Sequence, residues 1–387
     1  MKIESQIRTT VGIMHNTRDT KSTKLAENTQ STNLLGFLCG LCVLCGSSLC
    51  FLCGPLGGSV FAQQPSPAQR SLEIRQAQMP SDGEVHVLPV QGNVYMLVGA
   101  GGNIAVQIGD EGVLVVDTGL AAMSDKVLAA IRKLSAKPIR YIVNTHLHPD
   151  HTGGNEVIGK AGSTTAGGPT SIVAHENALS RMSAPLGKPG AAPPALWPTD
   201  TFFPEEKDFF FNDEAVMLYH DVAAHTDGDA IVFLRRSDVV VAGDIFITTG
   251  YPVIDTESGG SVQGVIAGLN RILDLTVPKH EQEGGTYVIP GHGHLSDESE
   301  VLEYRDTVVI IKERIEDMVK RGFTVEQVKA AKPTLDYDLH YGADSGPWTT
   351  AMFIEAVYRD VSKALTQKPA AAPRPAPAAT PAPKGKK

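Results

Sequence analysis

Four side chains that can bind a metal ion lie within six positions of a short segment, residues 144–155, which reads NTHLHPDHTGGN. They are His146, His148, Asp150 and His151. An apolar run at 141–143 precedes them, and in an extended chain side chains two positions apart lie on the same side, so His146 and His148 can converge. Imidazole nitrogens and carboxylate oxygens form a ligand set that suits Zn²⁺. The spacing therefore predicts a metal site at a strand end, with a histidine-rich surface turn as the alternative.

Three further residues of the same chemistry occur later in the chain. His225 stands in the sequence AHTDGD, Asp244 follows VVVAG, and His292 follows YVIPG. Asp244 and His292 thus come after short β-branched runs, where a sheet presents side chains at a common edge. Together with the first four residues they make seven ligands, enough for two metal ions and too many for one tetrahedral zinc.

This ordered set resembles the metallo-β-lactamase superfamily of binuclear metallohydrolases, over roughly residues 84–300. Asp117, in the sequence VVDTG, also matches an aspartate at an early strand end of that family. The resemblance implies an α/β fold of four layers, an αββα sandwich, here with a helical C-terminal extension. Hydrophobic periodicity by itself predicts only a layered α/β protein.

The resemblance also implies two zinc ions per chain and a role for each ligand. The first ion would be held by His146, His148 and His225, the second by Asp150, His151 and His292, and both by Asp244. Asp150 would in addition orient the attacking hydroxide, which makes it the predicted catalytic residue. Asp117 is expected to fix the tautomer of one of the imidazoles from behind.

The expected activity is that of an exported zinc-dependent hydrolase, in which a metal-bound hydroxide attacks a carbonyl of a small-molecule substrate. β-Lactam hydrolysis is the first specific expectation, although Asp244 stands where true β-lactamases of the family carry a cysteine or no ligand. The alternatives are thioester, lactone or ester hydrolysis at the same metals, and a periplasmic accessory protein of a redox pathway.

Composition excludes several other classes of protein. The net charge of −9 and the lack of a dense basic patch argue against a nucleic-acid partner. All five cysteines lie between positions 39 and 53, so neither disulfides nor thiolate ligands are expected in the main domain.

The N-terminal region reads as a targeting segment. Residues 34–53 are apolar or small and uncharged, basic residues precede them, and a small-residue site ends at Ala62. This pattern predicts, within 1–62, a polar leader and a cleaved export signal, with an uncleaved membrane anchor as the alternative. The protein is therefore expected in the periplasm or secreted, and the anchor would be its only contact with a membrane.

The remaining chain divides by its patterning. A linker is expected at 63–83, the catalytic domain at 84–300, a helical extension packing on the core at 301–366, and a disordered Pro/Ala/Lys tail at 367–387. Within the domain, residues 183–201 surround Trp197 and are rich in proline, alanine and glycine. They predict either a substrate-facing loop with an aromatic wall or a long surface connection.

Overall fold

The computed structural model describes residues 80, 82–221, 223–282 and 284–366. The predicted leader and export signal or anchor, most of the 63–83 linker and the 367–387 tail lie outside the described residues. Within the described ranges, no helix combines the length and apolar character needed to cross a bilayer.

The first sheet has seven strands in the order of the sequence. These are β1 (His86–Gln91), β2 (Val94–Val98), β3 (Ile104–Ile108), β4 (Val113–Val116), β5 (Ile139–Val143), β6 (Ser171–His175) and β7 (Asp200–Phe202). The first four strands pair antiparallel, and β4 to β7 pair parallel. All four residues of β4, Val-Leu-Val-Val, are buried because both faces of this sheet are covered.

The second sheet has six strands in the order β13-β12-β11-β10-β9-β8. They are β8 (Glu206–Phe211), β9 (Glu214–Asp221), β10 (Asp229–Leu234), β11 (Val239–Gly243), β12 (Tyr287–Pro290) and β13 (Ser296–Asp297). Only β11 and β12 pair parallel, joined by a connection that contains a long helix. Sequence patterning missed β8, which lies at the sheet edge and carries charged, partly exposed side chains.

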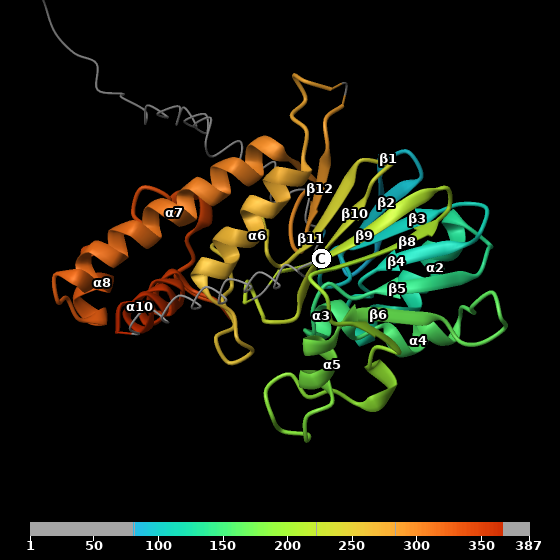
Figure 1. Cartoon of the computed structure of the whole chain (residues 1–387), viewed down its shortest axis with the longest axis horizontal. Helices are drawn as coiled ribbons and strands as arrows, with labels where there is room; N and C mark the ends of the chain where they lie inside the picture. Colours follow the sequence, from blue (N-terminus) through green and yellow to red (C-terminus); the bar gives the residue numbers. More distant parts are fainter. Residues whose placement is uncertain (1–79, 81, 222, 283, 367–387) are drawn as a thin grey trace, which may run out of the picture. The chain divides into compact units, whose positions relative to one another are not determined.

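Helices cover the outer face of each sheet (Figure 1). On the first sheet lie α2 (Ser124–Leu134), α3 (Pro149–Thr152), α4 (Asn155–Lys160) and α5 (Glu176–Met182). On the second lie α6 (Val262–Leu275) and α7 (Glu298–Lys320), and α10 (Thr350–Thr366) packs on these two helices. The short helices α8 (Val325–Ala331) and α9 (Asp338–Tyr341) lie between α7 and α10 in the chain. Two short 3₁₀ turns, Ala121–Met123 and Pro194–Leu196, complete the set.

Three apolar cores hold these layers together. One lies between the two sheets, one between the first sheet and α2 and α4, and one between the second sheet and α6, α7 and α10. The order is therefore helix, sheet, sheet, helix, and the predicted αββα sandwich with a helical C-terminal extension is confirmed.

Local signals set the ends of the long helices. Ser261 accepts a hydrogen bond from the backbone of Gly264 at the start of α6, and Asp297 accepts from Ser299 and Glu300 at the start of α7. Helix α7 thus begins at Glu298, ahead of the expected start of the extension. The sequence pattern predicts a last helix over 348–363. Helix α10 begins two residues later, at Thr350, which leaves Trp348 in a loop.

Candidate metal centre

The seven predicted ligands lie at the ends of strands that open on one edge of the sandwich. Residues 144–151 follow β5, His225 follows β9, Asp244 follows β11 and His292 follows β12. Because β5 pairs parallel with β4, and β12 with β11, the carboxyl ends of these strands meet at the same edge. This topology brings together residues up to 146 positions apart, counted from 146 to 292.

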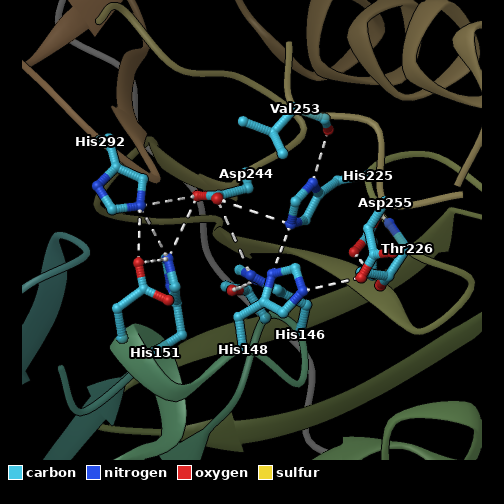
Figure 2. Close-up of polar contacts among 12 residues, drawn as sticks. His146, His148, His151, His225, Thr226, Asp244, Val253, Asp255 and His292 are labelled. Atoms are coloured by element: carbon cyan, nitrogen blue, oxygen red, sulfur yellow. Dashed lines mark hydrogen bonds and ion pairs between the residues drawn. The ribbon is translucent and has the colours of Figure 1, made fainter. Parts of the chain in front are cut away.

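The structure gathers all seven into one cluster (Figure 2). Within each of three groups, the potential ligand atoms lie within 4.8 Å of one another. The groups are His146, His148 and His225; His146, His151 and Asp244; and Asp150, His151 and His292. The first and third groups are the two ligand sets that the family resemblance implies.

Asp244 lies between these two sets (Figure 2). Its Oδ2 is 3.7 Å from Nε2 of His225 and 4.0 Å from Nε2 of His146. Its Oδ1 is 3.2 Å from Nε2 of His151 and 3.5 Å from Nε2 of His292. One carboxylate oxygen therefore faces each set, which is the arrangement that a carboxylate bridging two metal ions requires.

Oxygen acceptors behind the cluster fix the tautomers of three imidazoles. Nδ1 of His225 is 2.7 Å from the carbonyl oxygen of Val253, and Nε2 of His148 is 3.0 Å from Oδ2 of Asp255. Nδ1 of His151 is 2.7 Å from Oδ2 of Asp117. Carbonyl and carboxylate oxygens only accept, so these outer nitrogens donate and, in the neutral ring, the inner nitrogen carries a lone pair.

In neutral rings these inner lone pairs would face one another. Nε2 of His225 and Nδ1 of His148 are 2.8 Å apart, a repulsive contact between two neutral acceptors. Nε2 of His146 is buried and has no hydrogen-bond partner among the described residues. A divalent cation satisfies such converging imidazole nitrogens, so the residues present fit a metal site.

The carboxylates make the potential of the cluster negative. Burial lowers the pKa of His151, but Asp244 and Asp117 outweigh burial and raise it well above the usual histidine range. Burial raises the pKa of Asp150, but the hydrogen bond with His292 and the charge of His151 lower it to about 2. A potential that attracts protons to His151 also attracts cations. Burial instead lowers the pKa of His146 and of His225, which keeps these imidazoles in the neutral form that binds a metal.

A family model described as the metallo-β-lactamase superfamily matches residues 88–307. The chain belongs to this superfamily. The family predicted from the ligand motif is confirmed.

Named relatives within the superfamily include alkylsulfatases. A linear primary-alkylsulfatase of a Pseudomonas species is 26% identical over 265 residues, which cover 57% of this chain and 48% of the relative. The solved sec-alkylsulfatase Pisa1, also from a Pseudomonas species, has a TM-score of 0.54 at 17% identity and covers 71% of this chain and 50% of its own. A metallo-β-lactamase from Pontibacter korlensis has a TM-score of 0.46 at 16% identity, and the match covers 58% of this chain and 99% of the β-lactamase. The chain thus spans about half the length of the alkylsulfatases it matches.

Behind the metallo-β-lactamase ligand motif, Asp117 supports two histidines at once. It follows β4 with a left-handed backbone (φ 64°), and its Oδ1 accepts the backbone N–H of Thr145. Its Oδ2 accepts hydrogen bonds from Nδ1 of His151 and from the hydroxyl of Thr145. The same hydroxyl oxygen lies 3.0 Å from Nδ1 of His146, so Asp117 also supports this second histidine through Thr145. The predicted contact between Asp117 and an imidazole is confirmed.

Replacing Asp117 by asparagine is expected to weaken zinc binding by about 10- to 100-fold. If an NH₂ group took the place of Oδ2, it could not accept the hydrogen bonds that His151 and Thr145 donate, and the imidazole of His151 would lose its support. Competition with a chromogenic chelator measures the zinc dissociation constant. Asp238→Asn is the matched control, because Asp238 also has a left-handed backbone (φ 54°) but lies outside the cluster. Equal affinity in the two variants would contradict this role for Asp117.

Sequence reasoning missed Asp255, which contacts His148. Its Oδ1 accepts the backbone N–H groups of Glu257 and Ser258, so the carboxylate is fixed before it reaches the imidazole. The two residues are 107 positions apart, and no motif links them.

Other histidines near the motifs are structural. His175, which was not expected to be a ligand, begins α5 by accepting from the backbone of Asn177 and stacks on His220 at 3.5 Å. His294 contacts Glu300 and belongs to none of the potential metal groups found in the described residues.

A cavity of about 420 Å³ opens directly onto the cluster. His148, Asp150, His225, Asp244 and His292 line one side of it. Aliphatic and aromatic side chains line much of the rest, and among the described residues neither lysine nor arginine contributes to its wall. Trp197 is not part of this wall either, since it packs beside Leu147 and Met182 and donates to the carbonyl of Ala192.

Proposed function

We propose that this chain binds two zinc ions and hydrolyses an ester bond in a small substrate that has an acidic head and an apolar arm. The head would lie at the metals and the arm in the adjacent cavity. The observation that carries this proposal is the position of an apolar cavity directly against the seven-residue cluster. Apolar surface removed from water in such a cavity contributes to binding in proportion to its area.

Each half of the cluster would hold one ion, with Asp244 shared between them. Two bound divalent ions would supply a water of lowered pKa and polarise the bond to be cleaved. The protein contributes the orientation: Asp117, Asp255 and the carbonyl of Val253 hold the imidazoles with their lone pairs inward. Asp150 lines the cavity and, as an ionised carboxylate, can accept a hydrogen bond from a water there.

Charge favours an anionic head in the substrate. Two divalent ions would outweigh the two carboxylates that line the cavity, Asp150 and Asp244. Asp117 and Asp255 contact the outer nitrogens of the imidazoles, so on the cavity side an anion could bind the ions without help from lysine or arginine. An alkyl sulfate combines such a head with an apolar arm. The proposal of a sulfate ester is further supported by the name of the relative that matches in sequence, a linear primary-alkylsulfatase.

Carboxylic esters, lactones and thioesters rank second as candidate substrates, because their hydrolysis would require only the metals and the apolar wall of the cavity. β-Lactam hydrolysis ranks below them. A β-lactam antibiotic presents a carboxylate away from its scissile amide, and the described wall of the cavity has no cationic side chain to bind it.

Zinc analysis and a substrate panel test the proposal on the full chain. We expect two zinc ions per chain by elemental analysis. Octyl sulfate, an acyl-homoserine lactone, a thioester and a chromogenic cephalosporin would be compared, each with and without a chelator. Chelator-sensitive turnover of octyl sulfate above the other three is the expected result.

Two outcomes would contradict the proposal in different ways. Cephalosporin turnover well above the rest would make the protein a working β-lactamase despite Asp244. Stoichiometric zinc without turnover of any of the four would favour a non-catalytic accessory role.

A further inference from the structure

The loop between α9 and α10, residues 342–349, forms part of the cavity wall. Ala343, Pro347, Trp348 and Thr349 all line the cavity that His148 and Asp150 line from the other side. This loop lies beyond residues 88–307, the part of the chain that the superfamily model matches. The metal ligands therefore come from the shared fold, and this part of the wall comes from the C-terminal extension.

Contacts at the base of the loop hold it in place. The backbone N–H of Thr350 donates to the carbonyl of Ala343, and the N–H of Ala343 donates to the hydroxyl of Thr350, both at 2.9 Å. Gly346, at the exposed tip, has a φ of 108° that a side chain would disfavour. The loop is thus a closed turn whose two ends are pinned together.

Tyr251 ties the extension to the domain that carries the metal ligands. Its ring stacks on Phe353 of α10 at 4.7 Å, and its hydroxyl donates to Oδ1 of Asp338 in α9 at 3.0 Å. Its backbone N–H donates to the carbonyl of Tyr341. Tyr251 and Tyr341 themselves line the cavity, so the two parts of the wall are joined by direct contacts.

Trp348 is the largest side chain that the loop brings to the cavity. It is half-buried and packs against the core that contains Tyr251 and Phe353. Its indole Nε1 is buried and has no hydrogen-bond partner among the described residues. Because Nε1 is buried, the part of Trp348 that a molecule in the cavity can contact is the apolar surface of its ring.

We propose that Trp348 determines substrate specificity by covering the apolar arm of the substrate with its indole ring. This rests on the proposed function, since it takes the cavity beside the metal cluster as the substrate site. Burying one methylene group strengthens binding about fourfold. Affinity should therefore rise with the length of an alkyl chain, and the rise should depend on Trp348.

A binding experiment tests this without turnover. The chain has two tryptophans, so Trp197→Phe leaves Trp348 as the sole indole fluorophore. Butane-, hexane- and octane-1-sulfonate, which cannot be hydrolysed as esters, would be titrated into the zinc-loaded variant below their micelle concentrations. We expect a saturable change in emission, with the dissociation constant falling about fourfold per added methylene. Emission that does not respond to any of the three would overturn the proposal.

A kinetic experiment separates specificity from a structural role. With butyl, hexyl and octyl sulfate, Trp348→Ala should raise KM for octyl sulfate by at least about tenfold and flatten the dependence on chain length. Trp348→Phe keeps an aromatic ring and should preserve that dependence. Trp197→Phe is the matched control, because Trp197 lies outside the cavity wall. An equal loss of kcat/KM at all chain lengths in Trp348→Ala would mean that the ring is only structural.

The two proposals fail in different ways. Length-dependent binding of the sulfonates without turnover of any ester would contradict the proposed hydrolysis and leave the role of Trp348 standing. If Trp348→Ala hydrolysed alkyl sulfates with the chain-length preference of the unchanged protein, the role of Trp348 would be contradicted and the proposed hydrolysis would stand.

Discussion

Asp244→Asn is expected to lose bound metal and turnover together, with kcat/KM falling by about a thousandfold or more. Among the described residues, only Asp244 has one oxygen facing each ligand set. Burial raises the pKa of its carboxyl group, but the charges of His292 and His151 outweigh burial and hold the pKa well below the usual value. The side chain is therefore an anion in a buried site. An amide there would remove that charge and point a donor group at one of the two metals.

Elemental analysis and steady-state kinetics on the same preparation would check this expectation. Asp221→Asn is a matched control, because Asp221 is also a buried aspartate at a strand end of the second sheet, outside the cluster. Burial raises the pKa of Asp221 to about 6, and its Oδ1 lies 3.4 Å from Nε of Arg271, so Asp221→Asn also removes a buried carboxylate but touches none of the seven clustered residues. Full zinc content in Asp244→Asn would rule out the bridging role, whatever happened to the rate.

Asp150→Asn is expected to lower kcat by at least about a hundredfold while the fold stays intact. Asp150 lies 3.2 Å from Nε2 of His292 and lines the cavity, so it can contact both a ligand of the second ion and a water in the cavity. The first ligand set, His146, His148 and His225, does not include it. One zinc ion should therefore remain bound in the variant.

Thermal unfolding, zinc content and kcat together would test this second expectation. Asp125→Asn is a suitable control, because Asp125 also stands in the first turn of a helix but is exposed on α2. Unchanged kcat in Asp150→Asn would show that Asp150 has no catalytic role, and loss of the fold would show that its role is structural.

The ligand set was predictable from sequence because each ligand directly follows a strand or belongs to a compact motif. Asp244 follows VVVAG and His292 follows YVIPG, and strands of that composition end at a common edge of a sheet. The sequence pattern also predicts helices over 124–134 and 262–275, and these are the limits of α2 and α6. Amphipathic spacing and, for α6, a capping serine act over a few residues only, so a local pattern reports them.

The supporting residues could not be predicted in the same way. Asp255 reaches His148 across 107 positions, and no local pattern reports such a contact. The positions of the two tryptophans could not be predicted from a local pattern either. Sequence reasoning left Trp197 as an alternative for an aromatic wall, and it extended the last helix to include Trp348. The structure places Trp348 at the cavity and Trp197 in a separate apolar cluster, because tertiary packing decides which face of a loop is covered.

The division of the cavity wall bears on how such a protein can evolve. The residues proposed to hold the metals follow β5, β9, β11 and β12, whereas Trp348 stands in a loop pinned by its own pair of hydrogen bonds. Substitutions at the tip of that loop can change the shape offered to a substrate without altering any contact of the metal ligands. Selection can therefore act on the choice of substrate and on the chemistry as separate traits, with the C-terminal extension as the adaptable part.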